Sequence, residues 1–375
     1  MKFECARKDL HDVLTVVSGV VPTRTAIPAL ANVLIRAQAA KGKQPAALHV
    51  SATDLELSIS LTVPQADVQQ EGALALPAAR LAGILRESAD ETIRLEADGS
   101  LADVRAGGGR YKIVGLDAAD FPALPSYDAP RETEVSASDL KRMIRLTEFA
   151  ASTESVMYAL TGLLLELYDG KELRLVASDG KRMAYARTRQ VAKKGGKLSV
   201  IVPGKTLKLL DRLIDDRDES VFIFAPPEEN AVQFRTPRGA IVSRLIEGKF
   251  PDYENVIPKD RDKTVTIETE ALSGAMRRTA LMASDGARAV RLTLSKNKCT
   301  FFTRSADIGE ARTEAKVDYA GDTLEITFNP DFVLDYLKVV DVPTVELKFK
   351  DAATACIFSG GPDYTYVLMP LQIQM

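Results

Sequence analysis

The cysteines, the histidines and one glycine–lysine segment are of types that support chemistry, but each group lacks the spacing that the chemistry needs. Cys5, Cys299 and Cys356 are scattered thiols without the close pairs of a zinc or redox site. His11 and His49 are the only histidines, and two isolated imidazoles do not predict a histidine-dependent acid–base or metal centre. We therefore expect no catalytic residues, no metal and no cofactor.

The nearest approach to a nucleotide-binding motif is Pro203-Gly204-Lys205-Thr206, which resembles the end of a phosphate-binding P-loop. That loop needs a further glycine at position 199, where this chain has Ser199 in an apolar, strand-like stretch. Gly107-Gly108-Gly109 lacks the spacing of a dinucleotide-binding loop and predicts a hairpin turn. An enzyme with a nucleotide site at Lys205 stays open as an alternative, and it requires saturable nucleotide binding.

Composition bounds the class of protein. A chain of 375 residues with 46% apolar residues is too long for one ordinary core, so two or three globular domains are expected. The net charge of −3 by itself indicates neither nucleic acid nor membrane as a partner, although a local basic surface remains compatible with it. The chain has no signal-peptide pattern and no apolar run near the roughly 18 residues of a membrane span. With its scattered thiols, this predicts a cytoplasmic protein.

The elements that would position any functional residue recur three times, at a period of about 126 residues. Each copy opens with an amphipathic helix, over residues 10–17, 140–147 and 272–279. An antiparallel strand pair follows, over residues 31–35 and 47–54, 162–167 and 172–179, and 289–294 and 299–305. A second helix then begins behind Pro77, Pro203 or Pro330, a residue that suits the first turn of a helix.

The repeat predicts an α+β fold in which each copy packs two helices on antiparallel sheets. Polar, proline-containing linkers at Asp128-Ala129-Pro130 and Ile257-Pro258-Lys259 place the domains at 1–129, 130–258 and 259–375. Neighbouring copies are expected to pair their edge strands, and a curved row of copies can close into a ring with a second chain.

Local signals refine this outline. Ser138-Asp139 and Thr269-Glu270 are predicted as helix caps. Asp54 and Asp179 occupy equivalent positions of the repeat, so we interpret them as turn residues rather than as a catalytic acid pair.

Basic residues recur on the equivalent helices, which suggests a shared surface for a phosphate backbone without sequence readout. The side chains expected to face DNA are Arg24, Arg80, Lys141, Arg142, Arg145, Lys197, Lys205, Lys208 and Arg277. The alternative is that they are solvated helix faces beside acids such as Asp211 and Asp335.

Six phrases of the sequence stand in an order and spacing that single out one family. They are Met1-Lys2-Phe3, Ile27–Leu34, Val176–Ala184, Val200–Pro203, Phe250–Tyr253 and Tyr366–Pro370. Together they resemble the bacterial sliding clamp family, the β subunit of DNA polymerase III, over essentially the whole chain. The resemblance implies a non-catalytic processivity factor of the replicative polymerase: a head-to-tail homodimer of three-domain chains, closed into a six-domain ring that encircles and slides on duplex DNA.

The resemblance also implies partners that bind through short linear motifs: the replicative polymerase's catalytic subunit, the clamp loader, other polymerases and repair proteins. They would dock in a groove between the second and third domains. The matching positions here are Leu160, Ser178, Gly180, Lys181, Arg182, Met183, Pro251, Val256, Asn329, Phe332, Val367, Met369 and Leu371. Without the resemblance, Leu160 and Val256 would be interpreted as plain core residues.

The family's dimer contact maps to Tyr111 and Ile113 on one side and to Leu281 and Met282 on the other. The chain departs from the family where Phe332 replaces a common Tyr and Met157 a common Arg. The tail Leu371–Met375 is longer than usual, and the sequence leaves open whether it covers the groove. A diverged clamp that serves as a protein-interaction or drug-binding scaffold, with DNA loading secondary, is a third alternative.

Overall fold

The computed structural model of the chain describes residues 1–42, 45–125, 127, 132–168, 171–193, 198–226, 228–284 and 288–372. It divides into two compact units. The first consists mainly of Met1–Ser138 and Lys205–Leu245, and the second mainly of Asp139–Val191 and Ile246–Met375. The middle repeat therefore contributes strands to both units.

The described part of the first unit contains a five-stranded and a ten-stranded sheet. The smaller sheet has the order β5 (Asp67–Gln70), β1 (Lys2–Ala6), β7 (Thr92–Asp98), β8 (Leu101–Ala106) and β9 (Gly109–Val114). The larger has the order β10 (Leu116–Asp117), β6 (Gly72–Pro77), β2 (Asn32–Gln38), β3 (Ala47–Thr53), β4 (Leu57–Val63), β19 (Gly239–Arg244), β18 (Ala231–Thr236), β17 (Ser220–Phe224), β11 (Thr133–Ser136) and β15 (Val191–Lys193).

The described part of the second unit contains an eight-stranded and a four-stranded sheet. The larger has the order β16 (Ser199–Pro203), β12 (Gly162–Tyr168), β13 (Glu172–Ser178), β14 (Arg182–Thr188), β27 (Tyr364–Leu368), β26 (Cys356–Ser359), β25 (Thr344–Phe349) and β20 (Lys263–Glu268). The smaller has the order β23 (Gly309–Lys316), β22 (Lys298–Ser305), β21 (Val290–Ser295) and β24 (Leu324–Phe328).

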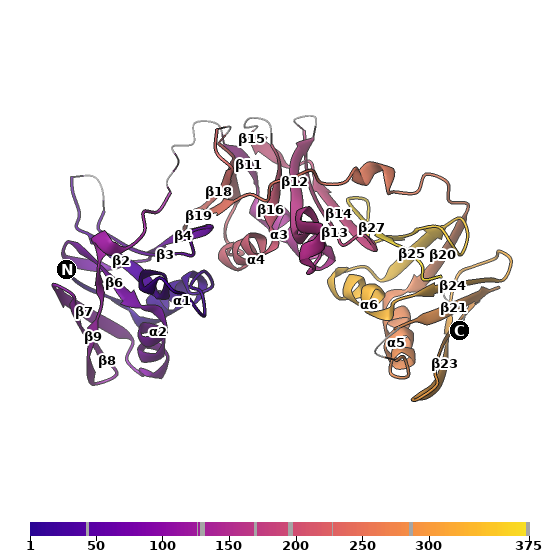
Figure 1. The fold of residues 1–375 in the computed structure, drawn as a ribbon, viewed down its shortest axis with the longest axis horizontal. Coiled ribbons are helices and arrows are strands. Elements are labelled where there is room, and N and C mark those ends of the chain that lie inside the picture. Colours follow the sequence, from indigo (N-terminus) through magenta and orange to yellow (C-terminus); the bar gives the residue numbers. More distant parts are fainter. Residues whose placement is uncertain are drawn as a thin grey trace. The chain divides into compact units, whose positions relative to one another are not determined.

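Within the described residues, six α-helices stand at the predicted places of the repeat. They are α1 (Arg7–Val17), α2 (Ala78–Glu87), α3 (Ala137–Thr147), α4 (Gly204–Leu213), α5 (Thr269–Ala280) and α6 (Pro330–Val339). In Figure 1, α1 and α2 lie together beside the strands of the first repeat, and α5 and α6 lie together beside those of the third. Each helix buries one apolar stripe, such as Leu10, Val13, Leu14 and Val17 of α1. The predicted α+β repeat is confirmed.

The sheets continue from one repeat into the next at two junctions. In the first unit, β4 pairs antiparallel with β19, from Leu57↔Ser243 to Leu61↔Gly239. In the second unit, β14 pairs antiparallel with β27, from Arg182↔Leu368 to Ala186↔Tyr364. Each pairing covers an edge strand that would otherwise expose its backbone groups. The prediction that neighbouring copies pair their edge strands is therefore confirmed.

The predicted helix caps are wrong by one or more residues. Helix α3 already begins at Ala137 and α5 at Thr269, so Ser138, Asp139 and Thr269 lie inside the first turn. The residue before α5 is Glu268, and its side chain makes no capping hydrogen bond. Both helices follow directly on strands, β11 and β20, so each begins where its strand ends.

The predicted turns are confirmed. Gly107 and Gly108 connect β8 to β9 with φ of 63° and 70°, values that favour glycine. Asp54 accepts the backbone N–H groups of Glu56 and Leu57, at 3.1 and 2.7 Å. Asp179 accepts those of Lys181 and Arg182, both at 2.9 Å. The two carboxylates therefore hold equivalent turns.

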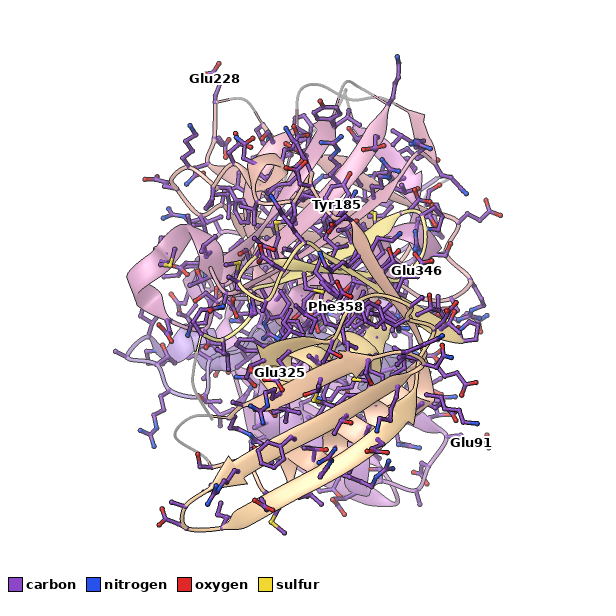
Figure 2. All side chains as sticks on the ribbon, turned by 90° about the vertical axis from the view of Figure 1, so that its right-hand side faces the viewer. Glu91, Tyr185, Glu228, Glu325, Glu346 and Phe358 are labelled. Carbon is purple, nitrogen blue, oxygen red and sulfur yellow. The ribbon has the colours of Figure 1, made fainter. Side chains whose placement is uncertain are left out.

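Side-chain burial follows the strand pattern in the third repeat. Phe358 on β26 is fully buried, whereas Glu325 on β24 and Glu346 on β25 lie at the surface in ion pairs with Arg291 and Lys348 (Figure 2). The eight-stranded sheet, which holds β25 and β26, and the four-stranded sheet, which holds β24, thus both place acidic side chains on a solvent-facing side.

A largely buried ion-pair network centres on Arg174 of β13. Its guanidinium donates to Glu172 and to Glu254, both at 2.7 Å, and to the hydroxyl of Tyr253 at 2.8 Å. It also lies 3.4 Å from the ring centre of Tyr168. These contacts attach the chain segment around η5 (Tyr253–Asn255) to the sheet, because Tyr253, 79 residues further along the chain, binds the Arg174 cation.

We predict that Arg174→Met lowers stability by about 3 kcal/mol, because it leaves the buried Glu172 carboxylate without its closest partner. The midpoint of thermal unfolding, followed by circular dichroism, measures the effect. Arg217→Met removes an ion pair of similar length from an arginine that is 90% exposed, and it should leave the midpoint unchanged. An equal loss in both variants would contradict the role of burial.

The same network predicts a pH dependence. Burial alone would raise the pKa of Glu172, but the hydrogen bond from Arg174 and the charge of Arg187 lower it below its ordinary value of 4.5. Because its folded-state pKa is lowered, the ionised Glu172 carboxylate stabilises the fold at pH values above its ordinary pKa. This contribution is lost as the pH falls through the lower folded-state pKa.

Glu172→Gln should therefore lower the unfolding midpoint at pH 7 and approach the wild-type value in strong acid. Glu346→Gln, which breaks an exposed pair with Lys348, serves as the matched control at both pH values. A Glu172→Gln deficit that persists undiminished in acid would rule out the carboxylate's charge as the cause.

Candidate functional site

The turn between β13 and β14 holds four of the predicted groove residues in a fixed loop. The Ser178 hydroxyl donates to the carbonyl of Arg182 at 2.8 Å and accepts the N–H of Gly180 at 3.1 Å. Gly180 has φ +83°, which an L side chain rarely adopts. The carbonyl of Lys181 accepts the N–H of Met369 at 2.9 Å. The turn is therefore bonded to the chain's C-terminal segment.

Arg182 connects this turn to α6. Its guanidinium donates to Asp179 at 3.0 Å, to Asp335 at 2.9 Å and to the carbonyl of Phe149 at 2.8 Å. Burial alone would raise the pKa of Asp335, but hydrogen bonds from Arg182 and Lys338 lower it below its ordinary value. The charge of Arg182 is thus largely used inside the protein, so its main role is to position the site.

Asp335 is a partner that sequence reasoning did not find. It lies 153 residues from Arg182 in the chain, and a pair so distant leaves no spacing signal in a single sequence. The ring centre of Phe332 lies 4.3 Å from the Arg182 guanidinium carbon, and this contact needs no hydroxyl.

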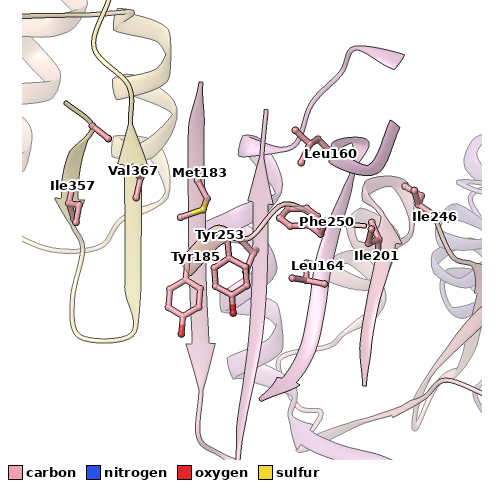
Figure 3. Close-up of a cluster of buried hydrophobic side chains, with 12 residues drawn as sticks. Leu160, Leu164, Met183, Tyr185, Ile201, Ile246, Phe250, Tyr253, Ile357 and Val367 are labelled. Atoms are coloured by element: carbon pink, nitrogen blue, oxygen red, sulfur yellow. The ribbon is translucent and has the colours of Figure 1, made fainter. Parts of the chain in front are cut away.

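A cluster of buried apolar side chains lies beside the β14–β27 junction (Figure 3). Leu160, Met183 and Val367 are each at most 2% exposed and belong to one cluster with Phe250 and Tyr253. Met183 and Val367 are direct cross-strand neighbours at the β14–β27 junction. The interpretation of Leu160 as a core residue is therefore correct, and its side chain supports the surface rather than forming an exposed part of it.

Several exposed apolar side chains stand in segments next to the β13–β14 turn or β27, or next to η5. Met157 is 48% exposed, Tyr158 62%, Val256 46% and Met369 44%. Val256 is thus not a core residue. A Cβ placed at Gly180 would lie 3.8 Å from the Met157 sulfur, so Met157 stands beside the turn. Tyr158, in η4 (Ser155–Thr161), was not among the predicted residues, because this stretch follows no helical or strand period.

The remaining predicted groove residues are Asn329, Leu371 and Pro251. Asn329 caps α6 by accepting the N–H of Asp331 at 2.9 Å. Leu371 donates its N–H to Thr327 at 2.7 Å, and Gln372 donates its side-chain N–H to Ala352 at 3.2 Å. The first two residues of the tail are therefore docked, while Ile373–Met375 lie outside the described residues. Pro251 is exposed.

The basic residues predicted to face DNA lie in both units. Arg80 on α2, Arg142 and Arg145 on α3, Lys208 on α4 and Arg277 on α5 are exposed, opposite the buried stripes of their helices. Arg24 is exposed between α1 and η1 (Pro28–Ala31), and Lys141 is half-buried. Lys197 lies outside the described residues.

Lys205 is an exposed cation that pairs with an acid of the first repeat. Its ammonium group lies 2.6 Å from the Asp54 carboxylate, so part of its charge is neutralised within the first unit. Its neighbour Thr206 is buried, and its hydroxyl is hydrogen-bonded to Ser243 at 2.7 Å. In a P-loop the equivalent hydroxyl must reach a metal ion, so this geometry weighs against a nucleotide site at Lys205.

The residues predicted for the dimer contact lie at sheet edges or beside a helix end. Tyr111 and Ile113 stand on β9, the outer strand of its sheet, and are 39% and 8% exposed. Leu281 and Met282 directly follow α5 and are 76% and 37% exposed. Tyr111, Leu281 and Met282 are thus exposed and available to an interaction surface, whereas Ile113 is buried.

The described ranges contain no group of three or more His, Cys, Asp or Glu side chains that could hold a metal ion. Among these same residues, no helix is both long and apolar enough to cross a membrane.

Comparison with known proteins identifies the family of this chain. Three family models match in order: the DNA polymerase III beta subunit N-terminal domain at residues 1–125, central domain at 134–252 and C-terminal domain at 254–372. The chain is 34% identical to the beta sliding clamp of Caulobacter vibrioides and 32% identical to that of Escherichia coli, in each case over the full length of both chains.

Solved structures agree with the family models. The crystal structure of the sliding clamp, DNA polymerase III subunit beta, from Pseudomonas aeruginosa bound to griselimycin superimposes with a TM-score of 0.90 at 31% identity, over all of both chains. With three consecutive domain models and full-length relatives in agreement, this chain belongs to the DNA polymerase III beta subunit family, the bacterial beta sliding clamps.

Proposed function

We propose that two copies of this chain close head-to-tail into a six-domain ring that encircles duplex DNA and slides along it. The observation that carries this proposal is the recurrence of exposed cations on equivalent helices of a thrice-repeated unit, in a chain matched end to end by beta sliding clamps. Contacts to the phosphate backbone alone hold a protein on DNA without fixing its position.

In this proposal, each chain contributes three domains, with boundaries near residues 129 and 258. Ring closure would join the face around Tyr111 and Ile113 on β9 to the face around Leu281 and Met282 of a second copy. Both faces expose large apolar side chains, and β9 has an unpaired edge within the described sheet. Burial of such edges and apolar groups is a common basis for cyclic dimers.

The ring is proposed to act as a processivity factor of the replicative polymerase in the cytoplasm and to perform no chemistry of its own. Partner proteins, including the polymerase's catalytic subunit, the clamp loader, other polymerases and repair proteins, would bind it through short linear peptides. Their docking surface would be the apolar set around the β14–β27 junction, where Met369 and Val256 are exposed above the buried Met183 and Val367. Flexible methionines suit a surface that accepts several peptides.

The ring predicts topological retention on DNA. Once loaded by a clamp loader, the protein should stay on closed circular DNA and should leave by sliding off when a restriction enzyme linearises the circle. Gel filtration of labelled protein with circular and cut DNA measures both states. Equal retention on the two forms would contradict encirclement.

The docking surface predicts a selective loss of peptide binding. Met369→Asp places a charge in an apolar contact. It should weaken the binding of a short linear peptide with a Gln-Leu-type motif, as the family's partners often carry, by at least about tenfold, measured by fluorescence polarisation. Ile308→Asp changes a side chain of similar exposure, 50% against 44%, on the β22–β23 turn and serves as the control. Sedimentation should give the same dimer for both variants. Undiminished peptide binding by Met369→Asp would place the docking surface elsewhere.

A further inference from the structure

The ten-stranded sheet of the first unit carries a cavity that the proposed function does not use. It measures about 470 Å³ and lies over β2, β3, β4, β19 and β18, with Leu124 and Pro125 at its margin. This volume falls in the range of small-molecule sites. We call it the serine hollow, after Ser51, Ser58 and Ser60, which line it.

The strand register explains why this part of the sheet is hollow. One cross-strand row runs Leu34, Ser51, Ser60, Ala240 and Arg235 across the five strands. The three central side chains of that row are small, and the Ser51 and Ser60 hydroxyls are hydrogen-bonded to each other at 2.9 Å. Small side chains in the middle of a row with large ones at its ends leave a depression.

The second junction shows that the same topology is compatible with a filled face. Counting from the equivalent turn residues Asp54 and Asp179, Ser60 corresponds to Tyr185, Ser58 to Met183 and Ser51 to Val176. Tyr185, Met183 and Val176 all belong to the buried cluster of the second unit. The Tyr185 ring also stacks on Tyr253, with ring centres 5.8 Å apart. The hollow is thus a consequence of residue choice at the first junction and not of the fold.

The polar groups of the serine hollow include two without an intramolecular partner. Gln233 is only 6% exposed, lines the cavity, and its side-chain amide makes no hydrogen bond within the described chain. The exposed Arg36 has no ion pair with any described residue, although it also lines the cavity. The Gln233 amide and the Arg36 guanidinium both line the cavity and are available to hydrogen-bond an added anion.

The other charges around the hollow leave Arg36 as its free cation among the described lining residues. Arg235 is paired with Glu132, its Nε lying 3.0 Å from the carboxylate. Burial, followed by the charge of Arg36, lowers the pKa of His49, whose Nδ1 lies 3.2 Å from the Thr62 hydroxyl. His49 is therefore a neutral hydrogen-bonding group at neutral pH, and the excess charge of the hollow is positive.

We propose that the serine hollow binds a small organic anion. Its carboxylate or phosphate ester would pair with Arg36, and its compact body would lie over the serines, within reach of the Gln233 amide and the apolar side chains of Leu34 and Val242. The positions of Arg36 and His49 are occupied by Glu166 and Arg174 at the second junction. The proposed ligand would therefore bind only at the first junction.

Ligand-observed saturation-transfer NMR on the full, DNA-free protein tests this proposal. Phenyl phosphate and benzoate serve as anionic probes, inorganic phosphate as the bare anion and benzamide as the neutral analogue. Wild type should bind the two organic anions saturably, and Arg36→Gln should weaken them about tenfold while leaving benzamide unchanged. Arg304→Gln, which changes another exposed arginine without an ion pair to a described residue, should leave all four probes unchanged.

Ser60→Tyr places the side chain found at the second junction into the hollow and should abolish binding of every organic probe. Gln233→Leu keeps the side-chain size and should weaken the anions without lowering the thermal unfolding midpoint, so the test stands even if Ser60→Tyr does not fold. Absence of saturable binding to wild type would overturn the proposal. So would binding of inorganic phosphate alone, or unchanged organic-anion binding in both Arg36→Gln and Gln233→Leu.

Discussion

Antiparallel backbone pairing between repeats is the constraint on which the rest of the structure depends. A single repeat ends on an open edge strand, β4 or β14, whose N–H and C=O groups need partners. The pairings β4–β19 and β14–β27 supply them and fix the register between repeats. A shift of one residue in either pairing would turn every side chain of the strand to the opposite face. Both junctions therefore place specific side chains side by side with little freedom.

The two junctions use one register for different purposes. At β14–β27, large side chains cover the face of the sheet that carries Val176, Met183 and Tyr185. Arg174 with its acidic partners attaches the segment around η5. That rigid base leaves Met369 and Val256 exposed where a peptide is proposed to dock. At β4–β19, serines replace the large residues and leave the face open. Divergence of side chains on a repeated backbone thus gives each junction its own surface.

Much of this was predictable from the sequence, for identifiable reasons. The helices over 10–17, 140–147 and 272–279 carry clear apolar stripes, and Asp54 and Asp179 mark turns by their position. The helix starts were less predictable, because α3 and α5 follow directly on strands, and the residue before α5 is Glu268, whose side chain makes no capping hydrogen bond. The Arg182–Asp335 pair was out of reach, since no local spacing signals a contact between residues 153 positions apart.

The docking site and the serine hollow illustrate what repetition adds to such reasoning. Ser51, Ser58 and Ser60 alternate along two strands, and taken alone they resemble any half-exposed sheet face. Only their alignment with Val176, Met183 and Tyr185 identifies them as a departure from a face that the fold is able to fill. An internal repeat thus supplies its own reference: where one copy is packed and its equivalent is hollow and lined by unpartnered polar groups, the difference points to a ligand rather than to stability.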